Sequence, residues 1–395
     1  MTGRGFKIGR LFGIEIRVDW SWLFIFFLTT WNLSVAFGQF HPDWGGALRW
    51  GLAVLATLLF FGSVLAHEMA HSLVARARGV PVRSITLFLF GGVSNIQREP
   101  PSPGTEFIMA LLGPVVSLVI GFALTILTTL SVGQQLQGTV QDPNQALQNF
   151  GPLATLFLWL GSINIILGFF NLIPGFPLDG GRILRSALWA LTDDLRKATR
   201  WASWVGQGIA WLMILAGIAM TFGATIPLFG TGFINGLWLA FIGWFLHNAA
   251  SQGYRRVVIQ DVLEDVEVQR VMREDPPVVA ADLTVEQLID HHIMRSDEQS
   301  FPVIENEKLV GMVTLGDVRK VPKERRSTVR VEEIMTPRAD LAIVGPHDEA
   351  SEALFALAQR DIRQLPVVSN GSLVGLLRRR DIVKWLQLQS ELELS

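Results

Sequence analysis

Six long apolar runs without charged residues constrain this chain more than any other feature. A helical span of a bilayer needs about 20 apolar residues, because the hydrocarbon core is about 30 Å thick and a helix rises about 1.5 Å per residue. The span is helical because its backbone must satisfy its hydrogen bonds within the segment. Half of the chain is apolar and only 17% of it is charged, which excludes an ordinary soluble protein. We therefore expect an α-helical polytopic membrane protein with about six spans, beginning at Trp20, Trp50, Phe107, Gly151, Trp201 and Thr231.

Basic residues alternate between the segments that separate these runs. Arg and Lys precede the first run and follow the second, fourth and sixth, whereas Ser131–Phe150 and Gly223–Gly230 contain neither. Because basic loops stay in the cytosol, this alternation predicts that both termini are cytosolic. The first run follows a basic segment as in a signal peptide, but no clear small-residue cleavage site follows it, so we interpret it as a retained span.

The density of charge rises after Tyr254. This shift predicts a membrane domain over residues 1–254, with its core at about 50–191, and a soluble domain over residues 255–395. The net charge of −2 argues against a nucleic-acid partner. The chain has no cysteine, so a transition-metal site has to use histidine and carboxylate ligands.

The soluble part contains an internal repeat with a constant offset of 64 residues. Phe301-Pro-Val-Ile returns as Leu365-Pro-Val-Val, and Asp317-Val returns as Asp381-Ile-Val. Asn370-Gly371 between two β-rich runs predicts a hairpin. We therefore expect two α/β copies, at about 260–325 and 326–388.

The sequence His67-Glu68-Met69-Ala70-His71 is the strongest chemical signal. Residues four apart share one face of a helix, so both imidazoles can reach one metal ion, and Glu68 lies beside them as a proton acceptor. A chance occurrence is the alternative. The motif ends a charge-free run, however, and ionisable groups inside a membrane are costly and usually functional.

Asp179 is the leading candidate for a third ligand. It follows the charge-free stretch Gly151–Leu178, whose last part, Pro174-Gly-Phe-Pro177, cannot be a continuous helix. Broken backbone at membrane depth is tolerated where it lines a cavity or is buried in protein. The alternative is that Asp179 only caps the helix that follows, and the spacing alone does not decide between the two.

These motifs together resemble the site-2 proteases, the intramembrane zinc metalloproteases. The second motif is Asn171-Leu-Ile-Pro-Gly-Phe-Pro-Leu-Asp179-Gly-Gly-Arg182, and the resemblance is best between Trp50 and Leu191. It implies that one Zn²⁺ per chain is held by His67, His71 and Asp179 and that Glu68 is the general base.

The same resemblance suggests roles for two other segments. It places Asn171 near the scissile carbonyl, where the alternative is an interhelical hydrogen bond. Phe90-Gly91-Gly92 resembles a membrane-associated β-hairpin of the family, whose edge strand would hold an extended substrate, and the alternative there is an ordinary turn.

The two soluble copies resemble cystathionine-β-synthase-type (CBS) domains, which work in pairs and often bind ATP, ADP or AMP. The resemblance implies nucleotide contacts at Thr314, Asp317 and Asp381, while for Asp317 a helix cap is the alternative. Arg378 replaces the usual hydroxyl residue in the second copy, so the pattern leaves two sites, one or none. A homodimer through these domains also fits the resemblance.

The combined interpretation is an intramembrane protease that cleaves single-span membrane proteins in a lipid bilayer, expected to be a bacterial cell membrane, under control of its CBS pair. A CBS-gated transporter or channel is the rival, although a transporter should carry polar groups near the midplane of several spans. A metal-binding scaffold without activity is a third hypothesis, against which the intact Glu68 argues.

Overall fold

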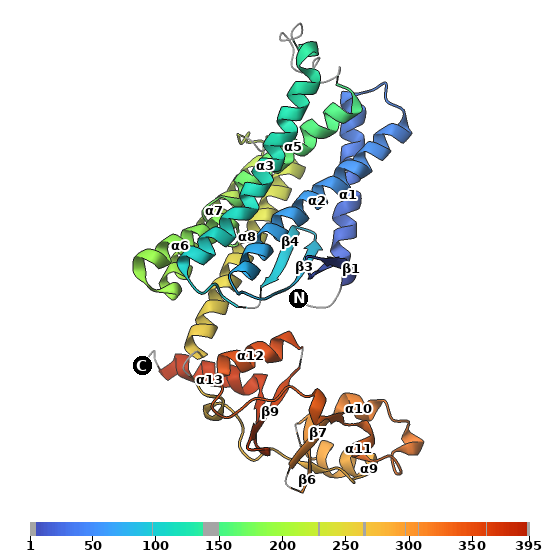
Figure 1. The fold of residues 1–395 in the computed structure, drawn as a ribbon, viewed down its shortest axis with the longest axis vertical. Helices are drawn as coiled ribbons and strands as arrows, with labels where there is room; N and C mark the ends of the chain where they lie inside the picture. Colours follow the sequence, from blue (N-terminus) through green and yellow to red (C-terminus); the bar gives the residue numbers. More distant parts are fainter. Residues whose placement is uncertain are drawn as a thin grey trace. The chain divides into compact units, whose positions relative to one another are not determined.

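The structure is a computed structural model that describes residues 5–96, 98–136, 150–227, 230–263, 266–296, 298–306, 308–360 and 362–392. Most of the predicted loop Ser131–Phe150 and part of Gly223–Gly230 lie outside the described residues. The chain divides into two compact units, Met1–Tyr254 and Arg255–Ser395, and each is described by itself (Figure 1).

Five helices in the described part of the chain are long and apolar enough to cross a membrane, and they contain the first five predicted spans. The sixth predicted span lies in α8 (Phe233–Leu263), which is not one of the five. Local chemistry sets some helix starts: the Asp19 carboxylate accepts from the Ser21 amide at 2.9 Å. The five are α1 (Trp20–Phe40), α2 (Gly46–Ala77), α3 (Pro103–Leu136), α5 (Pro152–Asn171) and α7 (Leu195–Thr221).

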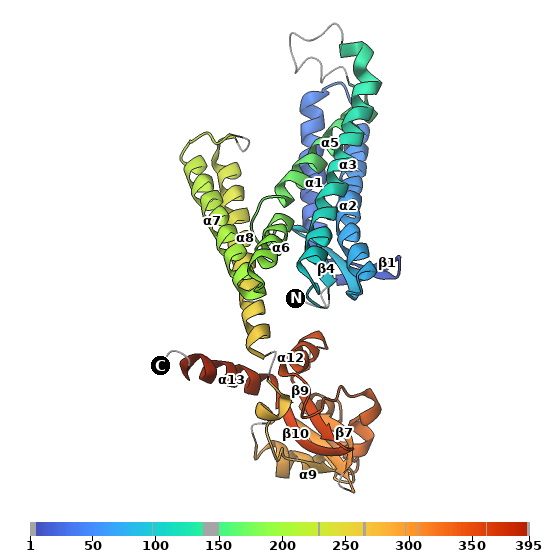
Figure 2. The same cartoon turned by 60° about the vertical axis from the view of Figure 1, so that its left-hand side comes forward.

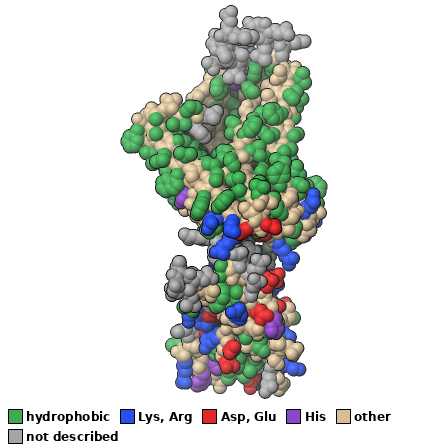
Figure 3. Space-filling view, turned by 90° about the vertical axis from the view of Figure 1, so that its left-hand side faces the viewer, with side chains coloured by type: hydrophobic (Ala, Val, Ile, Leu, Met, Phe, Trp, Pro, Cys, Tyr) green, Lys and Arg blue, Asp and Glu red, His purple; other side chains and the backbone are tan. Residues whose placement is uncertain are grey.

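The surface of the first unit is apolar over much of its area. Hydrophobic side chains cover most of its visible face, while charged side chains gather on the second unit (Figure 3). Phe24 on α1, Ile126 on α3 and Trp211 on α7 are each more than half exposed. A monomeric protein in water rarely exposes continuous apolar surface of this kind, whereas lipid-facing helices do so routinely.

The first unit is a bundle in which one short helix has a special place. Helices α1, α2, α3 and α5 stand together, α7 and α8 form a pair, and α6 (Asp179–Thr192) packs on both α3 and α7 (Figure 2). Gly180 and Gly181 bring α6 against the broken segment before it: a Cβ on Gly180 would lie 2.3 Å from the carbonyl oxygens of Leu172 and Ile173. These glycines hold the first turn of α6 at a fixed place in the bundle.

A four-stranded sheet adjoins the bundle, in the order β1-β2-β3-β4 among the described strands. The strand β4 is an edge strand that pairs antiparallel with β3 and packs against α2. The hairpin of β1 and β2 was not predicted, because the basic residues that precede the first apolar run indicate only the orientation of the chain. The strands are β1 (Gly5–Leu11), β2 (Ile14–Asp19), β3 (Val82–Phe88) and β4 (Gly91–Ile96).

The second unit repeats itself with the predicted offset. Its sheet follows the order β5-β6-β7-β10-β9, with β8 on β7, and Asn370 and Gly371 join β9 to β10 at positive φ, as a tight hairpin requires. Gln364 donates to the carbonyl of Ser300, its equivalent 64 residues earlier, at 3.1 Å. Because the same position of each copy meets at this contact, an approximate two-fold axis relates the two copies. The strands are β5 (Val279–Ala280), β6 (Ser300–Glu305), β7 (Lys308–Thr314), β8 (Thr336–Pro337), β9 (Gln364–Ser369) and β10 (Ser372–Arg378).

The two copies exchange their opening segments. Leu263 and Val268 pack in the core of the second copy beside Leu377, and Val331 packs in the core of the first copy beside Val313. Each core is therefore built from both halves of the repeat, which ties the two copies into one body. The helices are α9 (Val285–Leu288), α10 (Leu315–Arg319), α11 (Val331–Ile334), α12 (Ala350–Gln359) and α13 (Arg379–Leu392).

Candidate metal centre

Three candidate ligands meet inside the first unit. His67 and His71 project from α2, and their Nε2 atoms lie 3.1 Å apart. The Oδ2 atom of Asp179, at the start of α6, lies 3.0 Å from Nε2 of His67 and 3.2 Å from Nε2 of His71. Both imidazoles are buried, and only 13% of the Asp179 side chain is exposed. The structure thus brings together residues that lie 108 and 112 positions apart in the sequence.

The other imidazole nitrogens are held by α3. His71 Nδ1 donates to the carbonyl oxygen of Met109 at 2.6 Å, and His67 Nδ1 shares a 2.9 Å hydrogen bond with the hydroxyl of Ser117. A carbonyl can only accept, so Nδ1 of His71 carries a proton and the lone pair of its neutral ring lies on Nε2. Histidine ligands of metals are oriented in this way. The sequence did not point to Met109 or Ser117.

The spacing of the three atoms fits a zinc ion. Three electron-rich atoms at 3.0–3.2 Å repel one another unless a proton or a cation lies between them. Ligands about 2.0–2.1 Å from a tetrahedral Zn²⁺ are about 3.3 Å apart, close to the separations seen. The donor set of two imidazoles and one carboxylate also suits zinc, and it leaves a fourth position for water or substrate.

Gly113 of α3 makes room for this cluster. A Cβ at this position would lie 2.2 Å from Nε2 of His71 and 2.8 Å from Nε2 of His67. No side chain larger than hydrogen fits there while the imidazoles keep their places. The close approach explains a glycine inside a long helix, where it costs stability relative to alanine.

Asp179 does not cap α6 through its side chain. The N-cap of α6 is Leu178, which makes no side-chain capping hydrogen bond, and Asp179 occupies the first helical position. Its carboxylate points at the two imidazoles instead. The capping alternative is therefore not what the structure shows.

Glu68 lies next to the edge strand β4. Ser94 of β4 donates to Oε2 of Glu68 at 2.7 Å, and a Cβ on Gly92 would lie 2.4 Å from Cγ of Glu68. The strand and the candidate base are thus in direct contact. Ser94 is a further residue that the motifs did not indicate.

Phe90 and Asn171 are not among the three residues of the candidate metal cluster. The ring of Phe90, just before β4, stacks on Phe245 of α8 with centroids 3.9 Å apart. The amide of Asn171, at the end of α5, donates to the carbonyl of Leu167 in its own helix at 3.0 Å. The second hydrogen of that amide takes no part in this bond, so the role of Asn171 stays a prediction.

The candidate nucleotide residues of the second unit are engaged within the protein. Thr314 and Asp317 form a reciprocal capping box at the start of α10, with Thr314 Oγ1 donating to Asp317 at 2.6 Å. Burial works against ionisation of Asp317, but hydrogen bonds from Lys320 and Thr314 outweigh it and hold the pKa of this carboxyl below its ordinary value. Asp381 is bound by both ends of the Arg378 guanidinium, at 2.6 and 2.7 Å.

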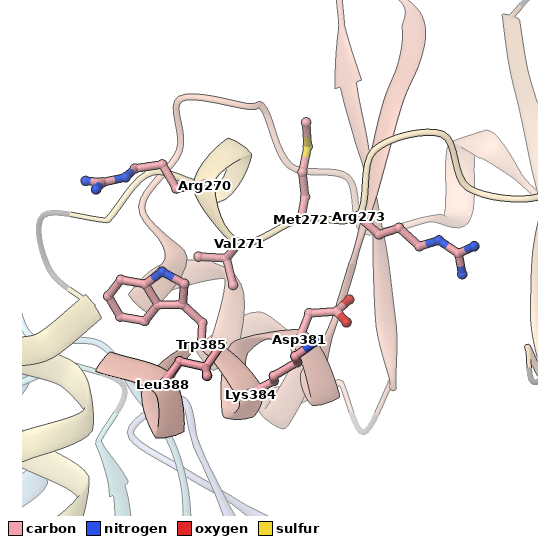
Figure 4. Close-up of a pocket in the computed structure, with 8 residues that line it drawn as sticks. All are labelled: Arg270, Val271, Met272, Arg273, Asp381, Lys384, Trp385 and Leu388. Carbon is pink, nitrogen blue, oxygen red and sulfur yellow. The ribbon is translucent and has the colours of Figure 1, made fainter. Parts of the chain in front are cut away.

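A cavity of about 220 Å³ lies beside Asp381, between the opening segment of the repeat and α13 (Figure 4). Trp385 and Val271 form its apolar wall, and Lys384 lies next to Asp381. The guanidinium of Arg273 points away from it and binds Glu298 at 2.7 Å. Its lining is Arg270, Val271, Met272, Arg273, Asp381, Lys384, Trp385 and Leu388.

Comparisons with known proteins agree with this organisation. A family model described as Peptidase family M50 matches residues 55–215, and a CBS domain model matches residues 267–324 and 331–388. A Synechocystis sp. protein assigned as a zinc metalloprotease is 34% identical over 384 residues, which cover 96% of this chain and 95% of the relative. A zinc metalloprotease of Methanocaldococcus jannaschii is 29% identical over 98% of each chain.

Among solved structures, a site-2 protease from Methanocaldococcus jannaschii is similar with 27% identity and a TM-score of 0.40, covering 63% of this chain and 95% of the other. The match over nearly the full length of the Synechocystis relative decides the family. This chain belongs to the Peptidase M50 family: it is a membrane zinc metalloprotease of the site-2 protease type that carries a tandem pair of CBS domains.

Proposed function

We propose that this protein is an intramembrane zinc protease that cleaves the membrane-spanning segments of single-span proteins. His67, His71 and Asp179 are its zinc ligands and Glu68 is its general base. The observation that carries the proposal is the convergence of three ligand atoms within 3.0–3.2 Å in a buried place, two of them from the membrane-type helix α2.

The residues of the chain divide the chemistry among them. When bound, zinc supplies Lewis-acid activation of the attacking water and of the scissile carbonyl. Glu68 accepts the proton of that water and passes it to the leaving nitrogen. Ser94 donates to Oε2 of Glu68, so Oε1 is the oxygen proposed to accept this proton. Asn171 is proposed to donate its second amide hydrogen to the developing oxyanion.

The edge strand β4 is the proposed binding place for the substrate. A peptide bond in a helix has its carbonyl hydrogen-bonded, so the substrate has to unwind before it can be cut. Strand addition to β4 would hold the unwound backbone extended. Gly92 lets β4 itself lie close to Glu68, which would bring a strand paired with β4 near the base. Phe90, stacked on Phe245, would mark the start of this strand.

The products distinguish a protease from the rival transporter, because only a protease releases protein fragments. Membranes of cells with the wild-type protein should release soluble fragments of single-span proteins, and those of cells with Glu68→Gln should not. Mass spectrometry of released fragments makes the comparison and also identifies the substrates. Identical fragment sets in the two strains would refute the proteolytic function.

We propose further that both termini and the Arg255–Ser395 unit are cytosolic, as the alternation of basic residues indicates. The membrane is proposed to be a bacterial cell membrane. The chain has no cysteine, so single cysteines can be labelled without background. Lys323→Cys should react with a membrane-impermeant maleimide only after permeabilisation. Ala224→Cys, exposed between α7 and α8, should react in intact cells. The reverse pattern would overturn the orientation.

The CBS pair is proposed to bind an adenine nucleotide and so to modulate cleavage. The cavity beside Trp385 offers an aromatic wall, and Lys384 supplies positive charge for phosphate (Figure 4). The guanidinium of Arg378 already binds both carboxylate oxygens of Asp381, so a ribose at this carboxylate would have to displace the guanidinium. This favours binding through phosphate and base rather than through Asp381.

A nucleotide should raise the melting temperature of the purified full-length protein by an amount that grows with ligand concentration. With Lys384→Gln, we expect the same rise in melting temperature to need about ten times more nucleotide, because one charge-assisted hydrogen bond is lost. Lys320→Gln, at the equivalent position of the first copy, is the matched control and should change little. If none of ATP, ADP and AMP raises the melting temperature below millimolar concentration, the CBS pair is a docking or dimerisation module. Light scattering on the same sample tests the proposed homodimer.

A further inference from the structure

A buried ion pair joins α6 to α3 close to the metal centre. Nε of Arg185 in α6 donates to Oε1 of Glu106 in α3 at 2.7 Å, and Nη2 of Arg185 donates to the same oxygen. Nη2 also donates to Glu99 at 2.9 Å, and the guanidinium lies 5.3 Å above the ring of Phe176. Glu106 has no exposed surface and Arg185 is only 4% exposed.

The proposed chemistry does not use this pair, and burial makes it costly to keep. In the described part of the chain, Oε2 of Glu106 is buried without a hydrogen-bond partner. The place of Glu106 in the first turn of α3 favours its negative charge. A buried ion pair is weak evidence for stability by itself, since apolar residues of similar volume often serve as well. In some proteins a buried ion pair instead favours one arrangement of two elements over others.

One face of α3 carries the residues of this helix that contact the two imidazoles and α6. Glu106, Met109, Gly113 and Ser117 follow one another at spacings of three and four residues, which places them along a single stripe. Met109 and Ser117 hold the two imidazoles, and Gly113 makes room for them. Glu106 extends this stripe by one turn and holds α6.

The same ion pair acts on the helix that presents the third ligand. Asp179 and Arg185 are six residues apart in α6, so they are separated by about 9 Å along the axis. Gly180 and Gly181 pack the first turn of α6 closely against the backbone of the segment before it. We propose that Glu106 and Arg185 are positioning residues for zinc: their ion pair holds α6 against α3 so that Asp179 meets His67 and His71. This inference rests on the proposed role of Asp179 as a ligand.

Arginine suits this task better than lysine would. Two nitrogens of its planar fork donate to one oxygen of Glu106, which fixes the direction of the helix as well as its distance. A lysine keeps the charge but acts as a point donor. The proposal therefore predicts that geometry, and not charge alone, sets the affinity for the metal.

The test measures the metal affinity of the purified full-length protein, using Co²⁺ and Zn²⁺ against a competing chelator. Glu106→Gln and Arg185→Lys should each lower the affinity about tenfold, the lower end of the effect of residues that orient metal ligands. The visible spectrum of bound Co²⁺ should change with them. Glu99→Gln is the matched control, because Glu99 contacts the same guanidinium from outside α3, and it should change the affinity less than about twofold.

A double-mutant cycle distinguishes positioning from a general loss of structure. In an Asp179→Asn background, Glu106→Gln should have little further effect on affinity, because the ligand that it positions is gone. Equal losses in both backgrounds, equal losses in Glu99→Gln, or unchanged affinity in Glu106→Gln would overturn the inference. If Glu106→Gln does not fold, Arg185→Lys in the same cycle decides the matter. Unchanged affinity in Asp179→Asn itself would instead overturn the proposed zinc site.

Discussion

Glu68→Gln is expected to abolish cleavage while zinc stays bound. The loss should be about 10²- to 10⁴-fold in the single-turnover rate, the usual contribution of a general base. Zinc should remain at one ion per chain, since Glu68 is not one of the three residues whose ligand atoms converge. The amide oxygen of glutamine can still accept the hydrogen bond from Ser94, so the contact with β4 should persist.

Two measurements on reconstituted protein check this result. One is the cleavage rate of a single-span substrate, and the other is the zinc content by mass spectrometry. The variant should still bind substrate and so retain it in a pull-down. A rate within tenfold of the wild type would place the base elsewhere, whereas a loss of zinc would make Glu68 a ligand.

Part of the candidate metal centre can be predicted from the sequence because it is local. The four-residue spacing of His67 and His71 places both on one face of a helix, and α2 has that form. Asp179 comes from another helix, more than a hundred residues later. No spacing rule connects the two segments, so the choice of Asp179 over a helix cap needed the resemblance to a family.

The supporting residues could not be predicted from pattern. In a soluble protein, the apolar stripe of a helix shows which face is buried. Membrane helices are apolar all round, so the sequence does not show which face of α3 meets α2. Ser117 and Glu106 could therefore not be assigned to the site, and Arg185 is one of several basic residues that follow the fourth apolar run, where the sequence indicates only orientation.

The soluble repeat shows a different limit. Its offset of 64 residues predicted equivalent strands, and β6 and β9 occupy equivalent positions. A repeat read along the sequence suggests that each copy closes its own core. The structure instead packs Val268 with the second copy and Val331 with the first. Such an exchange leaves no trace in the spacing of the copies, because it depends on which copy each segment contacts.

Gly113→Ala should remove zinc without unfolding the protein. The added Cβ would lie 2.2 Å from Nε2 of His71, far inside any real contact, so the imidazole has to leave its place. Since His71 Nδ1 is also held by the carbonyl of Met109 four residues earlier in α3, the ring cannot shift without losing that bond. We expect zinc affinity and cleavage to fall by about a hundredfold, the upper end of the effect of disturbing an oriented ligand.

Gly113→Ala should stabilise α3 while it weakens zinc binding, so a loss of zinc could not be attributed to an unstable helix. Alanine favours a helix over glycine by about 1 kcal/mol, so α3 itself gains from the substitution. Gly104→Ala in the same helix is the matched control, since nothing lies within 4 Å of its added Cβ. The control should keep zinc and cleavage, and both variants should keep the helical circular dichroism of the wild type. Zinc bound normally by Gly113→Ala would mean that the imidazoles do not approach α3 as closely as the structure places them, and the metal centre would then need a different geometry.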